Sequence, residues 1–115
     1  MKCIICGKEI NKFGNNPIPL VAKGNEKERC CDECNGYVVQ ARILSMKAET
    51  DINKANVGDL VVIFAVKNET YPYEILNETG KFLAGEITSI ENNLIFGTWG
   101  YFAITKDDSF IIVKN

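Results

Sequence analysis

The sequence predicts an α+β protein in which a small metal-held N-terminal half packs on a small antiparallel β-barrel. Two Cys-x2-Cys pairs lie within the first 34 residues, and the second pair opens a helical pattern. From residue 57 onward the pattern changes to short runs of β-branched and aromatic residues separated by turns. We therefore expect two units, residues 1–49 and residues 57–115, on either side of a polar segment at 49–56.

Composition is that of an ordinary globular protein. Of the 115 residues, 24% are charged and three are prolines, and no apolar stretch reaches the roughly 18 residues that cross a bilayer. We expect no membrane partner. Cys3 lies too close to the first residue for a secretory leader to precede it, so a reducing, cytoplasmic location is expected.

The two cysteine pairs are the strongest signal in the chain. Cys3 and Cys6 form one pair, Cys31 and Cys34 form the other, and 24 residues separate them. A Cys-x2-Cys turn directs two sulfurs to one point, and the positive end of a helix dipole favours thiolates. A closed shell of four thiolates suits structural Zn²⁺. Iron in a rubredoxin-like site and redox thiols or disulfides are the alternatives.

A fifth cysteine makes the register of the second pair ambiguous. Cys30 and Cys34 are four residues apart and could share a helical face. We favour Cys31 as the ligand because its spacing to Cys34 repeats that of the first pair, and we expect Cys30 to be a small buried hydrophobe. The chain has no histidine, which removes the commonest other ligand.

Between the cysteine pairs, "GNNPIPL" at 14–20 predicts a turn that feeds extended backbone, and the charged segment 23–29 predicts a hairpin tip. A helix is expected at about 32–49. Its apolar residues form two stripes, which imply two packing partners. The zinc hairpin can cover one stripe, and we expect the C-terminal half of the chain to cover the other, with a second molecule as the alternative. The stripes are Tyr37, Ala41, Leu44 and Ala48 on one side and Val39, Ile43 and Met46 on the other.

A knuckle, a hairpin and a helix that brings the last two ligands resemble the treble-clef zinc finger over residues 1–45, and Lys8 after "CIICG" fits such knuckles. In addition, "FGNNPIPL" at 13–20, "CCDECN" at 30–35 and "VVQAR" at 38–42 resemble a recurring type of small protein of bacteriophages and integrated elements. That resemblance implies a mobile-element origin.

In the second half, strands are expected at 60–66, 83–90, 94–104 and 109–115. Short turns at 91–93 and 106–108 predict antiparallel hairpins between adjacent strands. The "VGDLVVI" start, a long loop at 67–81 and the close-set strands that follow resemble the SH3-like barrels over 57–114. The resemblance implies a groove for an extended peptide or nucleic acid, lined by Tyr71, Tyr73, Trp99 and Tyr101. The alternative is that the large aromatics fill a core.

Charge is split unevenly along the chain. Residues 1–55 carry nine Lys and Arg against seven Asp and Glu, whereas residues 56–115 carry four against eight. The first half therefore permits nucleic-acid binding as a second hypothesis, in which basic side chains contact phosphates and barrel aromatics stack on bases. The candidate phosphate contacts are Lys8, Lys12, Lys23, Lys27 and Arg29.

Catalysis finds no support in the pattern. No histidine is available, the thiols belong to a closed site, and Asp107 and Asp108 sit in a turn rather than as facing carboxylates. We expect a non-enzymatic zinc protein that binds a protein partner, for example to inhibit a host defence system, and we expect no small-molecule substrate.

Overall fold

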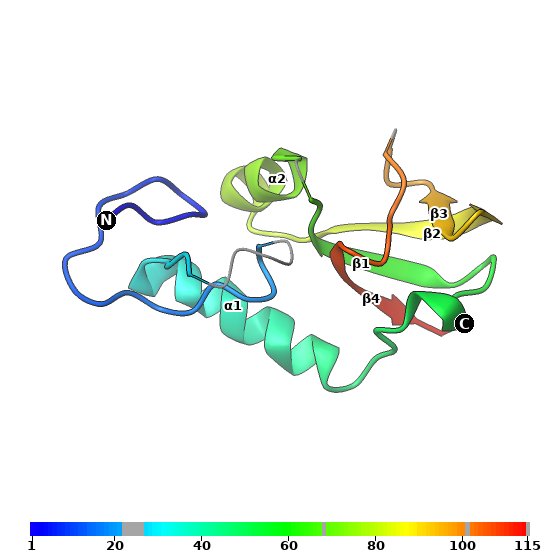
Figure 1. Ribbon diagram of the computed structural model, residues 1–115, viewed down its shortest axis with the longest axis horizontal. Coiled ribbons are helices and arrows are strands. Elements are labelled where there is room, and N and C mark those ends of the chain that lie inside the picture. Colours follow the sequence, from blue (N-terminus) through cyan, green and yellow to red (C-terminus); the bar gives the residue numbers. More distant parts are fainter. Residues whose placement is uncertain (22–26, 68, 101, 115) are drawn as a thin grey trace.

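The computed structural model describes residues 1–21, 27–67, 69–100 and 102–114. Within these residues the protein is α+β, with one antiparallel sheet and two α-helices in a body of 44 × 26 × 26 Å (Figure 1). No helix in the described part of the chain is both long and apolar enough to span a membrane. The elements, in chain order, are α1 (Asp32–Ser45), a 3-10 turn η1 (Ile52–Lys54), β1 (Leu60–Ala65), α2 (Tyr71–Thr79), β2 (Leu83–Glu91), β3 (Leu94–Gly97) and β4 (Ser109–Val113).

The four strands form a curled antiparallel half-barrel in the order β3-β2-β1-β4. The sheet confirms an α+β class with an antiparallel second half, whereas the finer SH3-like and treble-clef assignments stay predictions. One expectation about connectivity is wrong. The turn at 106–108 does not join neighbouring strands, because β4 crosses the sheet and pairs with β1, where Ile111 lies opposite Val62.

The turn between β2 and β3 forms as predicted. Asn92 and Asn93 both adopt positive φ, the conformation that a two-residue hairpin needs and that Asn tolerates. The run expected at 94–104 is shorter than predicted, because β3 ends at Gly97. The chain then turns back, and Ile104 forms a single bridge with Ile95.

Residues 71–79, expected as part of a long loop, form helix α2. Pro72 stands in its first turn, and Gly80 ends it in the left-handed conformation (φ 70°). Pro72 and Leu76, four residues apart, are buried on the same side of the helix. The helix forms because this short apolar face has a core to pack against.

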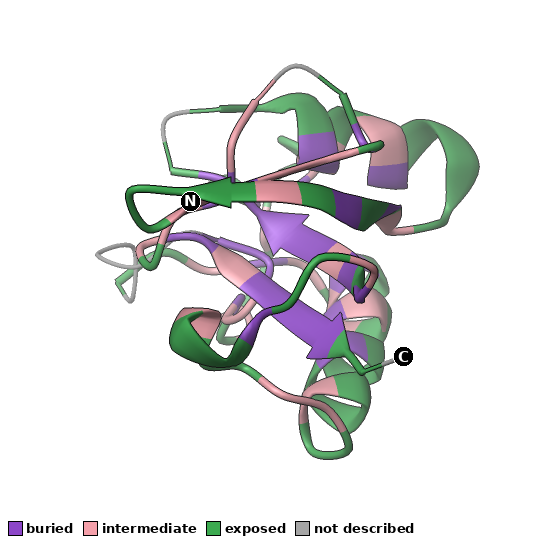
Figure 2. Ribbon diagram, turned by 90° about the vertical axis from the view of Figure 1, so that its right-hand side faces the viewer, coloured by how far each residue is buried: buried purple, intermediate pink, exposed green. Residues whose placement is uncertain are grey.

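Each face of the sheet carries its own hydrophobic core. Alternate residues of β1 point to opposite faces: Val61 and Ile63 to one, Val62 and Phe64 to the other. Figure 2 shows the buried residues concentrated on β1 and β4. The inner core of the curl contains Val61, Ile63, Ile87, Ile95, Trp99, Ile104, Phe110 and Ile112. The outer core contains Cys3, Ile5, Leu20, Cys30, Cys34, Val38, Ala41, Phe64, Leu76 and Ile111.

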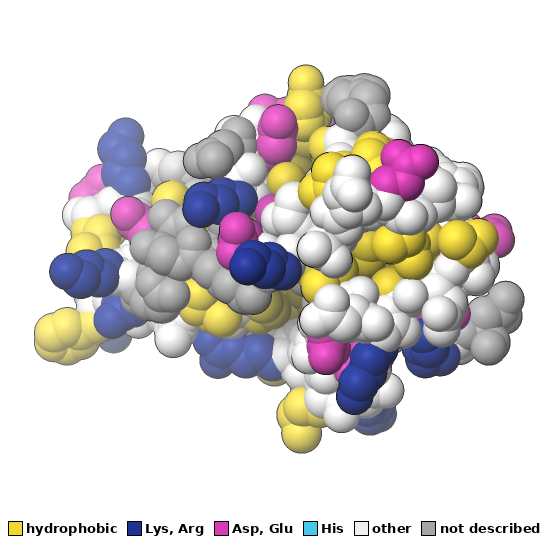
Figure 3. All heavy atoms as spheres, turned by 45° about the vertical axis from the view of Figure 1, so that its right-hand side comes forward, with side chains coloured by type: hydrophobic (Ala, Val, Ile, Leu, Met, Phe, Trp, Pro, Cys, Tyr) yellow, Lys and Arg dark blue, Asp and Glu magenta, His cyan; other side chains and the backbone are white. Residues whose placement is uncertain are grey.

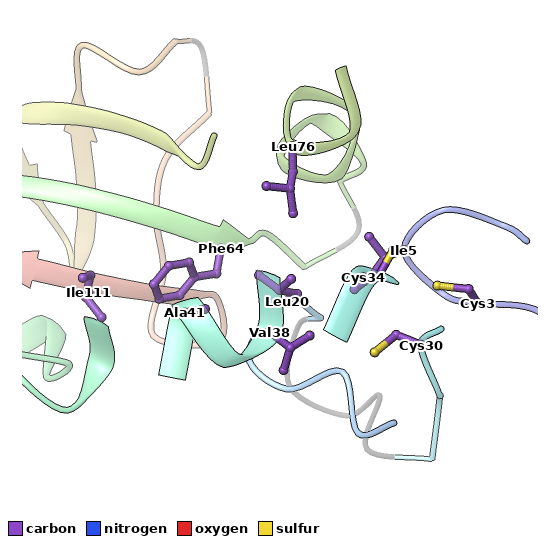
Figure 4. Packing of buried hydrophobic residues seen from close by; sticks show 10 residues of the cluster. All are labelled: Cys3, Ile5, Leu20, Cys30, Cys34, Val38, Ala41, Phe64, Leu76 and Ile111. Carbon is purple, nitrogen blue, oxygen red and sulfur yellow. The ribbon is translucent and has the colours of Figure 1, made fainter. Parts of the chain in front are cut away.

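The outer core joins the two halves of the sequence (Figure 4). Val38 and Ala41 of α1 pack with Phe64 of β1 and Ile111 of β4. Backbone hydrogen bonds in both directions between Glu49 and Ile112 attach the segment after α1 to the edge of the sheet. The limits of the two expected units, 1–49 and 57–115, stay a prediction.

Helix α1 ends at Ser45, four residues before the predicted end, and only one side of it is covered. Its buried row is Cys34, Val38 and Ala41. The expectation that the C-terminal half covers the second stripe is wrong, because Val39, Ile43 and Met46 are 44%, 50% and 84% exposed. The sheet lies against the opposite side of the helix (Figure 1).

We expect Gly97→Ala to destabilise the protein by about 1–3 kcal/mol, the usual cost of overpacking. A Cβ at this position would lie 2.1 Å from Cζ3 of Trp99 and 2.4 Å from the carbonyl oxygen of Glu86. Urea unfolding measures the change. The matched control is Gly36→Ala. Gly36 is exposed on α1, and a Cβ added there would meet nothing within 4 Å. Its effect should be a stabilisation of about 0.5–1 kcal/mol, and equal effects of the two variants would contradict this account of Gly97.

Candidate metal centre

The first half of the site is a tight turn at the N-terminus. The N–H of Cys3 donates to Lys8 O (2.8 Å) and that of Gly7 donates to Cys3 O (2.9 Å), which closes the turn between Cys3 and Cys6. Gly7 has a φ of 79°, a conformation that costs glycine little. The N–H of Cys6 points at Cys3 Sγ, 3.5 Å away. This bond pattern places two sulfurs side by side.

The second half is the start of α1. Cys31 is the N-cap residue, and its Sγ accepts from the N–H of Cys34 at 3.4 Å. The free N–H groups and the dipole of a helix start favour negative charge there. Both halves therefore donate a backbone N–H to the first sulfur of their pair, as the repeated x2 spacing suggests.

The two halves bring four sulfurs together. The Sγ atoms of Cys3, Cys6, Cys31 and Cys34 all lie within 4.8 Å of one another. Those of Cys6 and Cys31 are 3.7 Å apart. A tetrahedral ion with bonds of about 2.3 Å to sulfur needs sulfurs about 3.8 Å apart. The four residues therefore fit a metal ion.

The thiols of the site differ in how readily they lose a proton. Burial raises the pKa of the Cys34 thiol far above its ordinary value, and contact with the Cys31 and Cys6 sulfurs raises it further. Burial also raises the pKa of Cys6. At Cys3 burial acts in the same direction, but hydrogen bonds from nearby backbone N–H groups outweigh it and lower the pKa to about 7. Cys6 and Cys34 thus keep their protons at neutral pH unless a cation displaces them.

Cys30 stands outside the sulfur cluster. Its side chain is fully buried in the outer core, and its sulfur points away from those of Cys3 and Cys34 (Figure 4). Burial raises its pKa to about 11, and the neighbouring Cys3 and Cys31 add to the rise. The structure thus places Cys31 in the cluster and gives Cys30 the environment of an apolar core residue.

The segment between the cysteine pairs is fastened to α1 on both sides of the site. Asn15 exchanges backbone hydrogen bonds with Cys30, and its side-chain Nδ2 donates to Asp32 Oδ1 at 2.9 Å. Arg42 donates from Nε to Ile18 O and from Nη2 to Asn16 O, at 2.8 and 3.0 Å. The "GNNPIPL" segment therefore braces the helix. Of the expected hairpin, the described residues show a single bridge, between Asn15 and Cys30. Residues 22–26, at its expected tip, lie outside the described residues.

The four aromatics predicted to line one groove do not come together. Tyr73 packs against the outer core from α2, whereas Trp99 is 7% exposed in the inner core on the opposite face of the sheet. The Trp99 indole donates to Phe102 O at 2.9 Å. Tyr71 lies on the first turn of α2, and Tyr101 lies outside the described residues. For Trp99, packing is the role that the structure shows.

The basic residues of the first half do not form a dense face. Lys8 pairs with Glu33 at 3.2 Å, and Arg29 donates to Glu28 O. Lys12 and Lys27 are exposed, and Lys23 lies outside the described residues. On the face that Figure 3 shows, Lys and Arg side chains are spread over the surface and interleaved with acidic ones. This arrangement does not give the dense positive surface with which proteins usually bind a phosphate backbone.

A large cleft in the described part of the chain lies away from the sulfurs, in a region where no residue had been predicted to bind. It has a volume of about 890 Å³ and borders the first residues of β4, Ser109 and Phe110. Val21, Phe64 and Ile52 give it an apolar lining, and Asp51 and Asp107 add acidic groups. No pattern within one segment could indicate the cleft, because segments from at least five parts of the chain build it.

Within the described residues, the edge of β4 beside this cleft is only partly bonded: the hydroxyl of Ser109 donates to Val21 O at 3.1 Å. Ile112 uses both its N–H and its C=O to bond Glu49 across the edge. Two residues earlier in the strand, Phe110 directs its backbone groups to the same side, and no described residue bonds them there. An open strand edge beside an apolar cleft is the arrangement that an extended peptide recognises.

Comparison of the chain with protein-family models, with curated proteins and with solved structures finds no match.

We expect Cys34→Ser to abolish stoichiometric metal binding and to unfold the N-terminal half, because the ligand set loses one sulfur and the outer core loses its anchor. Cys30→Ala, the matched control, should keep the metal and cost about 1–2 kcal/mol for a small cavity. Metal content by elemental analysis and thermal unfolding by circular dichroism check both. Loss of metal from Cys30→Ala would show that the ligand set is wrong.

Proposed function

We propose that this protein is a structural zinc protein that acts by binding a protein partner and not by catalysis. The observation that carries the proposal is the cluster of four sulfurs, which is closed by cysteines from two segments and continues directly into the outer core. A site with four protein ligands has no open position for a substrate. The role of the ion is therefore to hold the fold.

The donor set favours zinc over the alternatives. Four thiolates in a tetrahedral arrangement suit Zn²⁺ or iron, and a closed shell that stabilises a small core is the usual role of Zn²⁺. A redox pair needs an exposed thiol of low pKa. Cys3 and Cys34 are buried, and burial raises the pKa of the half-buried Cys6. The apparent binding energy of such sites, on the order of 10–16 kcal/mol, would hold a half-domain this small together.

Binding without catalysis is supported by the roles of the two buried carboxylates, Asp59 and Asp108. Asp108 accepts from the N–H groups of Lys67 and Thr105 at 2.7 and 2.8 Å. Asp59 accepts from the N–H of Asn56 and from Lys114 Nζ, at 2.9 and 2.7 Å. Both groups fasten turns, so neither is available as a general base.

We place the partner-binding surface at the cleft beside β4. A partner segment in extended conformation would bond the outward N–H and C=O of Phe110 and insert an apolar side chain between Val21 and Ile52. Asp51 and Asp107 at the cleft favour a basic residue next to it. The likeness of "FGNNPIPL" and "CCDECN" to bacteriophage proteins supports a mobile-element origin, in which the partner belongs to a host system.

We expect one zinc ion per chain in purified protein and no visible colour from iron. Excess chelator should melt the first half, because the buried thiols then lose the cation that balances them. Elemental analysis, together with near-ultraviolet circular dichroism before and after chelation and after return of Zn²⁺, tests this. A metal-free preparation that keeps its fold and melts as the metal-loaded one does would refute a structural zinc site.

We expect peptides selected from a random display library to bind the zinc-loaded protein in extended form. Asn53→Trp, which fills the cleft from its exposed rim, should weaken their binding roughly tenfold or more, whereas Glu78→Trp on α2 should not. Fluorescence anisotropy measures the affinities. Equal loss from both variants would move the binding site elsewhere.

The dependence of affinity on ionic strength distinguishes the nucleic-acid alternative from binding of a peptide. Affinity for an oligonucleotide should fall steeply between low and moderate ionic strength, whereas an apolar peptide contact should change little. Tight oligonucleotide binding at moderate salt, together with failure of the peptide selection, would favour the alternative.

A further inference from the structure

The outer side of α1 presents a row of exposed side chains from one end of the helix to the other. Asp32, Gly36, Val39, Ile43 and Met46 follow one another at spacings of four, three, four and three residues. This spacing repeats every seven residues and keeps the row on one face, as in the seam of a two-helix coiled coil. The three apolar members are 44%, 50% and 84% exposed.

We propose that this row is the contact between two copies of the chain, with the two α1 helices packed antiparallel about a two-fold axis. Figures 1 and 2 show α1 at the rim of the molecule, with its outer side facing away from the sheet. A second copy can therefore approach along the whole helix. Even a Cβ added at Gly36 would meet nothing within 4 Å, so this position leaves room for Ile43 of the other copy.

Charge complementarity selects the antiparallel orientation. The first turn of α1 carries Asp32, which accepts from Asn15 Nδ2, whereas Lys47 lies just past the other end of the helix. The neighbouring charges have contacts within the chain, since Glu33 pairs with Lys8 and Arg42 donates to two backbone carbonyls. Antiparallel packing brings Asp32 of each copy near Lys47 of the other, and it also opposes the two helix dipoles. Parallel packing would set like charges side by side. No ion pair in the described part of the chain uses Lys47.

The most exposed hydrophobic side chains fit the same arrangement. Phe13 is 94% exposed, and its loop lies beside the first residues of α1, because Lys12, Gly14 and Asp32 line one small cavity. Met46, at 84%, stands just past the other end of the helix. A two-fold axis brings Phe13 of one copy to the end of α1 where Met46 of the other lies, and a sulfur–aromatic contact is favourable.

The expected association is weak. A contact built on one 14-residue helix from each copy buries less than the roughly 1,600 Å² of a standard interface. The protein should therefore be monomeric when dilute and dimeric when concentrated. Dimerisation uses neither the sulfur site nor the cleft, so its failure would leave the proposed function intact.

Sedimentation equilibrium of the zinc-loaded protein over a wide range of concentration tests the proposal. We expect a monomer–dimer equilibrium that Ile43→Glu weakens at least tenfold. Ile90→Glu is the matched control, because Ile90 is an isoleucine of similar exposure (40%) on β2. A monomer at every concentration, or equal effects of the two variants, would overturn the proposal.

A charge exchange tests the orientation. Lys47→Glu and Asp32→Lys should each weaken self-association, because each creates two like-charge contacts across the axis. Mixed together, the two variants should pair with one another, since both contacts then join opposite charges. Metal content shows whether each variant is folded. If the mixture associates no better than either variant alone, the antiparallel pairing is wrong.

Discussion

The structure depends on the confinement of four thiols within a few ångströms of one another. Cys3 and Cys34 are at once members of the sulfur cluster and of the outer core, so this core closes only where the sulfurs approach one another. Burial alone opposes their ionisation, as the raised pKa of Cys34 shows. A divalent cation bound by the four sulfurs would remove this opposition by displacing protons, and its free energy of binding would then contribute to folding.

The effect of the site extends beyond the N-terminal half. Because Cys34 faces the sulfurs, the rotation of α1 about its axis is fixed, and Val38 and Ala41 follow it into the outer core against Phe64. Asn77 of α2 donates to the carbonyl oxygen of Ile5 at 3.0 Å, so α2 also rests on the cysteine turn. Among the described residues, none before Ile52 belongs to the inner core. The two cores therefore differ in how directly they depend on the cysteine cluster.

The parts of the fold that local chemistry determines could be predicted from the sequence. The cysteine spacing identified the four clustered residues, and β-branched runs located the strands. Helix α2 was missed because its apolar face is only one turn long and gains stability from tertiary packing. The pairing of β4 with β1 was missed because it depends on contacts distant in sequence. The cleft was missed for the same reason. The burial of Trp99 against Gly97 and Gly85 agrees with the core role that the sequence offered as the alternative to a groove.

The predicted packing of α1 was wrong because it left out the effect of Cys34 on the rotation of the helix. The predicted stripes treated the helix as free to rotate, whereas Cys34 sets the buried row and leaves Val39, Ile43 and Met46 on the opposite side. The buried apolar residues of β1 and β4 already belong to the inner or the outer core, and α2 rests on the outer core. Other apolar side chains remain exposed, Phe13 among them, but the exposed fractions of Val39, Ile43 and Met46 show that no described part of the chain covers the row. If the row is to leave water, the cover must come from a second molecule, and the opposite charges at the two ends of α1 make a second copy of the same helix the best match.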